Sequence, residues 1–183
     1  GLPFLDLGHA IERETERARV LLAEGKRLSA GLVPTVYALV LAHLALLAID
    51  DERWDEADAF VMKARTAQRV AGVQDYTSQA VVSAAQALTL AHRGDHVQAR
   101  ADADQAAKCL ALLRGGSPFL GMLTRIALAR ARAELGEGGQ ARALLGEVRE
   151  LAGDHPLPLL TDWEERTLEL VEGLGGDAEG PAL

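Results

Sequence analysis

The chain has 183 residues and a formal net charge of −8 at pH 7, so it suits one domain or one short repeat array. The net negative charge argues against a surface that grips nucleic-acid phosphates, because such a surface needs clustered Lys and Arg. Cys109 is the single cysteine, which excludes a disulfide framework and a cysteine zinc cluster and indicates a reducing, cytoplasmic setting.

The sequence predicts helices throughout. Apolar residues make up 49% of the chain and aromatic residues only 4%, and Ala and Leu, which lose little freedom in a helix, supply most of the difference. In chain order we expect a first helix over 9–28, hairpins of 34–50 with 54–71, 76–93 with 97–113 and 118–135 with 140–152, and a last helix over 159–174. That makes about eight helices in an all-α fold.

The domain boundaries follow from this order. Residues 1–174 form one helical-repeat domain, and the glycine-rich end, 175–183, reads as a flexible linker. The longest apolar run, 37–49, contains His43 and falls short of the roughly 20 residues that a membrane span needs, so no membrane segment is expected. The first residues open abruptly, and we expect the chain to be a piece of a longer protein.

The predicted hairpins share a gap-free repeat of 42 residues. Small residues recur at Ala57, Ala99 and Ala141, and a second set lies twelve positions earlier in the same register: Ala45, Ala87 and Ala129. The first helix continues the register upstream, so it reads as the second half of a further repeat. A fixed period between about 20 and 50 residues is typical of a solenoid, in which each unit buries its apolar face against its neighbours.

The turns carry a resemblance to a known repeat. Gly94-Asp95-His96, followed by Ala99, is similar to the G-D-aromatic-x-x-A turn of tetratricopeptide repeats, although a unit of 42 residues exceeds their usual length of about 34. The longer unit resembles the helical sensor region of MalT-type regulators of the LuxR family. The stretches that start at Leu22, Asp75 and Phe119, and together span about 22–151, resemble the actinobacterial branch of that family.

This resemblance implies a right-handed superhelix of antiparallel hairpins that senses a small effector or a protein partner. It also implies an ATPase module upstream and a helix-turn-helix DNA-binding domain downstream in the whole protein. Neither is in this chain, since no G-x-x-x-x-G-K-[ST] loop occurs and no basic recognition helix follows the linker. We therefore expect no ATP hydrolysis and no direct nucleic-acid binding from these residues.

The residues that could carry other chemistry have simpler explanations. His92 and His96 have a metal-like spacing, but Gly94 and Asp95 between them break the helix, so no metal site is expected. The glycines at 136–139 fit a turn between helices better than a phosphate-binding loop, which needs a preceding strand. No serine or cysteine has a catalytic signature around it. We expect no enzyme activity and no cofactor.

The inner face of the array is the most promising binding surface. Repeat arrays use the concave side for ligands, and here the first helix of each hairpin should line it. The residues expected to bind an effector or partner are Leu39, Leu46, Asp50, Val81, Leu88, His92, Leu123, Ile126, Arg130 and Glu134. Arg130 replaces the Leu of the other two units, so it is the best candidate to recognise an anion.

Two alternatives stay open at this point. The inward side chains could simply pack against adjacent helices, and Arg130 could form an ordinary ion pair with Glu134, four residues later. The function predicted for the chain is a non-catalytic sensor domain, with a plain scaffold for protein assembly as the alternative. Self-association into a homodimer is a third, because open repeat ends lack polar caps.

Overall fold

The structure is a computed structural model that describes residues 16–17, 19–24, 34–71, 76–113, 118–153 and 158–176. In those ranges every regular element is a helix and no strand occurs, which confirms the predicted all-α class. Residues 16–17 and 19–24 are helical and belong to the predicted first helix; the remainder of that helix lies outside the described ranges. Most of the predicted linker, 177–183, lies outside them as well.

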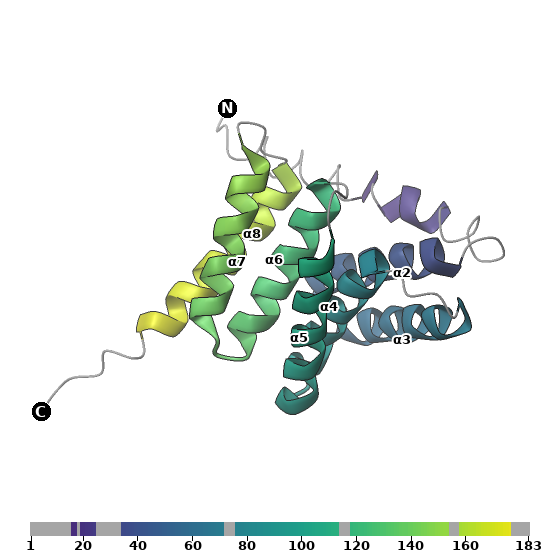
Figure 1. The fold of residues 1–183 in the computed structure, drawn as a ribbon, viewed down its shortest axis with the longest axis horizontal. Coiled ribbons are helices and arrows are strands. Elements are labelled where there is room, and N and C mark those ends of the chain that lie inside the picture. The colour runs from purple at the N-terminus through teal and green to yellow at the C-terminus, as the bar shows by residue number, and fades with distance from the viewer. Residues whose placement is uncertain are drawn as a thin grey trace, which may run out of the picture.

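Three helical hairpins follow one another and a further helix completes them (Figure 1). The helices are α2 (Pro34–Asp50), α3 (Trp54–Ala71), α4 (Tyr76–His92), α5 (His96–Leu112), α6 (Pro118–Glu134), α7 (Gly138–Ala152) and α8 (Pro158–Gly176). The hairpins pair α2 with α3, α4 with α5 and α6 with α7. All these bounds agree with the predicted ones to within two residues.

The first helix of each hairpin forms the interior. Helices α2, α4, α6 and α8 stack in that order, while α3 also touches α4, α5 touches α6 and α7 touches α8. The second helices therefore flank the stack, and the hairpins turn relative to one another from α2 and α3 to α6 and α7 (Figure 1). Helix α4 lies between neighbours on both sides and is buried almost all round, as expected of a helix with small or apolar residues on every face.

The 42-residue repeat recurs in the backbone of the three turns. Glu52, Gly94 and Gly136 each have a positive φ, of 59°, 82° and 77°. Each donates its N–H three residues back, and the next residue donates its N–H five residues back, for example Glu52 to Ile49 and Arg53 to Ala48. This is the Schellman pattern that satisfies the last carbonyls of a helix, so all three hairpins turn in the same way.

Replacing Glu52 with glycine should stabilise the fold by about 0.5–1 kcal/mol. A left-handed conformation costs an L-residue roughly 1–2 kcal/mol, and the greater freedom of glycine in the unfolded chain offsets part of the gain. Urea unfolding of Glu52→Gly measures this. Gly94→Ala is the matched control: no atom lies within 4 Å of an added Cβ, so the loss of about 1 kcal/mol expected there comes from the backbone alone. Equal midpoints for both variants and the wild type would contradict the assignment of these turns.

The small residues of the repeat lie where helices meet. Ala57, Ala99 and Ala141 are all 0% exposed, as the register predicts. Ala99 packs with Ala91 of α4 and with Leu135, which follows α6, so it joins the second hairpin to the third. A larger side chain has no room at such a position without moving a neighbouring helix.

His43 is a half-buried polar group on α2. Its Nδ1 lies 2.7 Å from the carbonyl oxygen of Leu39, a contact in which the neutral ring donates. Burial lowers the pKa of His43 below its usual 6.5, and the hydrogen bond to Leu39 opposes this only in part. The folded chain therefore holds His43 neutral under conditions in which the unfolded chain would protonate it.

Acid should destabilise the fold through His43. Because the folded state binds fewer protons at this site, the free energy of unfolding is at its full value above about pH 6.5 and decreases as the pH falls from there through the lowered pKa. His43→Gln should flatten that part of the pH profile in chemical unfolding measured between pH 7.5 and 5. If the profile of His43→Gln coincides with that of the wild type, another group is responsible for the acid sensitivity.

A charged network joins the second hairpin to the third. The guanidinium of Arg132 on α6, only 7% exposed, lies 2.6 Å from Asp104 on α5 and 2.6 Å from Glu137 in the following turn. Arg100 of α5 also reaches Glu137, at 2.9 Å, and donates to the Leu135 carbonyl. Burial by itself would lower the pKa of Arg132, but the hydrogen bonds to Asp104 and Glu137 outweigh it and raise that pKa.

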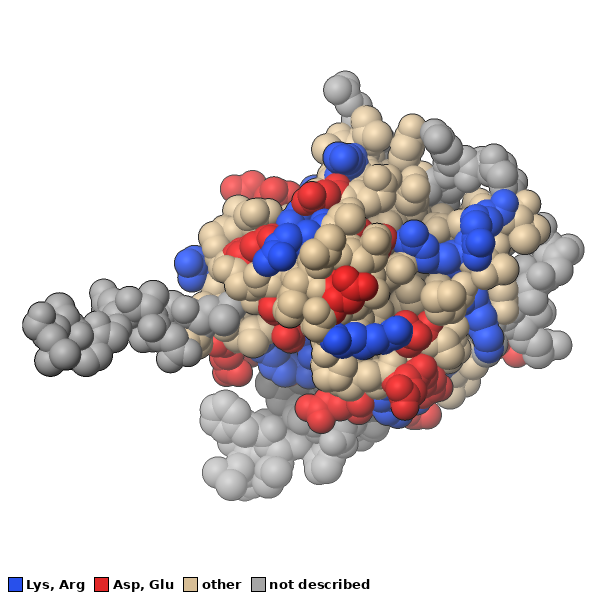
Figure 2. All heavy atoms as spheres, turned by 90° about the horizontal axis from the view of Figure 1, so that it is seen from below, with Lys and Arg blue, Asp and Glu red and all other residues tan. Residues whose placement is uncertain are grey.

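The charged groups of the surface are mixed in sign. Figure 2 shows basic and acidic side chains interspersed over one face of the molecule, with uncharged residues between them. A surface that tracks a phosphate backbone carries a continuous basic stripe instead.

Candidate functional site

The inner side of the array contains a cavity of about 190 Å3 where the first hairpin approaches the last helix. We call it the inner cavity. Residues from α2, α6 and α8 line it: Leu46, Asp50, Ile126, Ala127, Arg130, Glu134, Trp163, Arg166, Thr167 and Leu170. Five of the ten residues that the sequence nominated are in this set, and all five come from α2 and α6.

An ion pair joins α8 to the end of α2 on the inner side of the array. Arg166 of α8 lies 2.7 Å from the carboxylate of Asp50, at the end of α2, and 2.5 Å from Asp162 on its own helix. Burial alone would lower the pKa of Arg166, but the two carboxylates raise it. The first and last described helices of the stack are thus linked directly, and the inner cavity lies beside this link.

Arg130 carries a charge in the cavity without a direct partner. Burial lowers the pKa of Arg130; the carboxylates of Asp50 and Glu134 oppose that effect, and the positive charge of Arg166 adds to it. Within the described residues, neither Arg130 nor Glu134 has an opposite charge within 4.0 Å. The simple ion pair between Arg130 and Glu134 is therefore not formed. In that order along a helix, with the cation first, the pair is also the weaker of the two arrangements.

The other nominated residues do not line the cavity. Val81, Leu88 and Leu123 are buried in the hydrophobic core, and Leu39 is half-buried and packs against that core. These four residues were expected to bind an effector or partner, but consecutive first helices approach closely enough to use their side chains for packing. The alternative of packing against adjacent helices describes them correctly.

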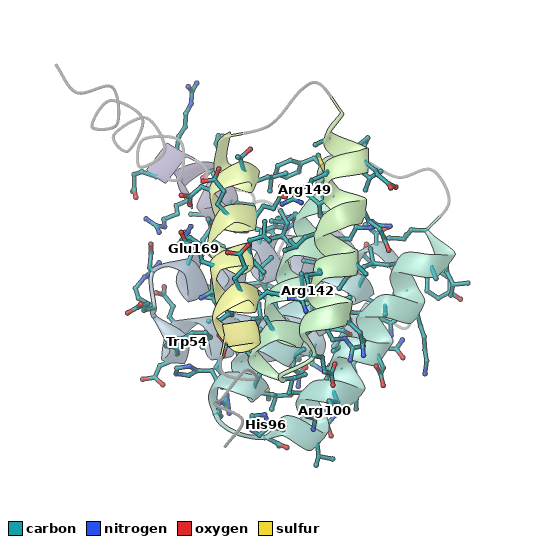
Figure 3. The ribbon with its side chains drawn as sticks, turned by 90° about the vertical axis from the view of Figure 1, so that its left-hand side faces the viewer. Trp54, His96, Arg100, Arg142, Arg149 and Glu169 are labelled. Carbon is teal, nitrogen blue, oxygen red and sulfur yellow. The ribbon has the colours of Figure 1, made fainter. Side chains whose placement is uncertain are left out.

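His92 has a structural partner. Its ring stacks on that of Trp54 with centroids 3.7 Å apart and planes inclined by 5°. Trp54 also packs against the core, and Figure 3 shows it toward the same end of the molecule as His96 and Arg100. The stacked pair joins the start of α3 to the end of α4. Since His92 does not line the inner cavity, it is not a polar anchor there.

The sequence missed the contribution of α8. Continuing the 42-residue register from Ile126 and Arg130 nominates Leu168 and Glu172, whereas the cavity is lined by Trp163, Arg166, Thr167 and Leu170. Helix α8 packs on α6 and α7, and its Arg166 reaches Asp50 of α2, so the cavity-lining face of α8 is the one turned toward the preceding helices. Trp163 is buried, and its indole N–H has no hydrogen-bond partner among the described residues. The presence of a tryptophan on this predicted helix was the signal in the sequence that could have pointed to the contribution of α8.

A second hollow lies between the outer helices α3 and α5, with α4 as its floor. This outer groove measures about 550 Å3 and is lined almost wholly by polar residues: Met62, Arg65, Gln68, Arg69, Ser78, Gln79, Ser83, Gln86, Asp102 and Gln105. An ion pair of 2.8 Å joins Arg65 to the buried Asp102 across it. Gln68 also donates to Ser78 there, whereas the side-chain oxygen of Gln86 is buried without a hydrogen-bond partner among the described residues. We take the inner cavity as the candidate site because five of the residues that the sequence predicted line it.

Cys109 is a free cysteine and is buried. Burial raises the pKa of its thiol, and a hydrogen bond with Gln105 opposes this in part, so the reactive thiolate is disfavoured. Among the described residues no cluster of three or more His, Cys, Asp or Glu side chains is placed to hold a metal ion. In the same part of the chain no helix has both the length and the apolar character to cross a membrane.

Comparison with known proteins gives no match for this chain among protein families, curated proteins or solved structures.

Proposed function

We propose that this chain is the ligand- or partner-binding sensor region of a MalT-type regulator of the LuxR family, folded as a tetratricopeptide-like right-handed superhelix. The observation that carries the proposal is the inner cavity, with the unpaired Arg130 in its wall. Arg130 is partly buried and has no direct partner among the described residues, so it loses hydration without gaining an ion pair, which supports an occupant with a negatively charged group. The resemblance in sequence over 22–151 is the reason for placing this sensor region in a MalT-type regulator.

A ligand in the inner cavity would act on the array as a whole. The cavity is built from α2, α6 and α8, which belong to the first hairpin, the third hairpin and the final helix. An occupant therefore touches both ends of the described stack and favours the curvature that brings them together. Such a bias shifts a population only if the ligand binds one curvature more tightly than the other.

The cavity is suited to binding and not to catalysis. Its hydroxyl group, on Thr167, donates to the Trp163 carbonyl at 2.7 Å, as a serine or threonine on a helix commonly does. The remaining lining side chains are charged or apolar, and no histidine lies among them to activate a nucleophile. In the proposed regulator, ATP hydrolysis and DNA binding belong to the modules that the resemblance implies elsewhere, and the mixed charges in Figure 2 agree with this.

The alternative function is a plain scaffold for protein assembly or self-association. The burial of Val81, Leu88 and Leu123 favours it, because a filled inner face leaves only outer surfaces for contact. On this alternative the inner cavity is a packing defect between α2, α6 and α8.

A panel of small metabolites in a thermal-shift assay separates the two functions. A ligand that binds only the folded chain raises the melting temperature. Arg130→Ala should then weaken binding of the active metabolite tenfold or more while leaving the melting temperature of the free protein nearly unchanged. Arg142→Ala is the control, since Arg142 lies on α7 (Figure 3) and is not among the residues that line the cavity. If no metabolite shifts the melting temperature, the scaffold is the better description.

A further inference from the structure

We infer that the inner cavity binds a small zwitterion, an α-amino acid with a short apolar side chain, whose carboxylate pairs with Arg130 and whose ammonium pairs with Glu134. This inference rests on the proposed function and names the class of ligand. It starts from the two opposite charges of α6 that line the same cavity, one helical turn apart, without contacting each other or any other opposite charge in the described ranges.

The spacing of the two charges fits such a ligand. Residues four apart on a helix lie on one face, with Cβ atoms about 5–6 Å apart. In an α-amino acid the ammonium and carboxylate groups share a single carbon, so one molecule can reach both side chains at once. Each would then gain the charge-assisted hydrogen bond that it lacks in the free chain.

The balance of charge in the cavity disfavours a simple ion. Its lining carries two arginines, Arg130 and Arg166, and two carboxylates, Asp50 and Glu134. A ligand with only a carboxylate would be attracted by Arg130 but repelled by the carboxylates of Asp50 and Glu134. A ligand with only an ammonium group would be repelled by the positive charges of both arginines. A zwitterion adds no net charge, and Asp50 and Arg166 are already engaged with each other.

The apolar residues that line the cavity and its volume limit the polarity and size of the ligand's side chain. Leu46, Ile126 and Leu170 supply apolar surface, and the volume of about 190 Å3 is below the roughly 300–1,000 Å3 of common small-molecule sites. The cavity therefore has room for a few carbons beyond the charged groups. Alanine or valine fits this description, and tryptophan or arginine does not.

The test uses the chain with free amino acids at millimolar concentration as probes. We expect L-valine or L-alanine to raise the melting temperature and to give a saturable heat of binding in titration calorimetry. N-acetylvaline lacks the ammonium and valinamide lacks the carboxylate, so each should bind at least tenfold more weakly than valine. Tryptophan should produce no shift.

Two variants assign the contacts to residues. Arg130→Gln should weaken valine binding tenfold or more, and Glu134→Gln should do the same although Glu134 is exposed and in no ion pair among the described residues. Arg142→Gln, outside the cavity, should bind as the wild type does. Circular dichroism of each variant checks that the helices are intact.

The outcomes separate the inference from the proposed function. If N-acetylvaline binds as well as valine, or if Glu134→Gln has no effect, the ligand is an anion and the zwitterion is wrong, while the sensor stands. If no amino acid binds but another metabolite does so through Arg130, the same conclusion follows. If neither amino acids nor any other metabolite binds, the inference and the sensor function fail together.

Discussion

Arg132→Ala should destabilise the fold by about 2–3 kcal/mol, among the largest effects expected of a single substitution here. The change removes a nearly buried guanidinium that contacts Asp104 and Glu137 at 2.6 Å. Breaking a buried ion pair costs about 3–5 kcal/mol, since it leaves a charge without its partner. We expect less because Asp104 is 59% exposed and regains water, and because Arg100 still holds Glu137.

Urea unfolding followed by circular dichroism measures this loss. The exposed Arg142 provides the control, as Arg142→Ala should change stability by less than about 0.5 kcal/mol. Combining Glu137→Gln with Arg132→Ala should cost less than the sum of the two single changes, because both remove the same contact between Arg132 and Glu137. A loss for Arg132→Ala no larger than that of the control would mean that the network contributes nothing to the junction of the second and third hairpins.

Ala99→Leu should cost roughly 1–3 kcal/mol by overpacking the same junction. Ala99 is 0% exposed and lies against Ala91 and Leu135, so a larger side chain must displace a helix. Ala101→Leu, two residues away and exposed on α5, adds the same atoms without a neighbour to displace and should leave stability within about 0.5 kcal/mol. Thermal or urea unfolding of the pair gives the comparison. Equal stabilities would show that Ala99 is not at a tight contact.

The sequence by itself determined the helices and their grouping. Residues 42 apart have the same local partners, so Ala57, Ala99 and Ala141 could be recognised as equivalent packing positions without coordinates. The turns follow the same logic, because the left-handed residue at 52, 94 and 136 and its Schellman hydrogen bonds depend only on residues a few positions away. Interactions of this kind depend on residues close together in the chain, so a short stretch of sequence is enough to predict them.

Only the tertiary structure decided which inward residues are available to a ligand. Leu46 and Leu88 occupy equivalent places in the register, yet Leu88 of α4 is enclosed by the neighbouring helices while Leu46 borders the inner cavity. The difference comes from how closely successive hairpins approach and how far the array turns, and these depend on side-chain volumes summed over every interface. Trp163 and Arg166 enter the site for the same reason: α8 packs on α6 and Arg166 reaches back to Asp50 of α2, a placement that no repeat register contains.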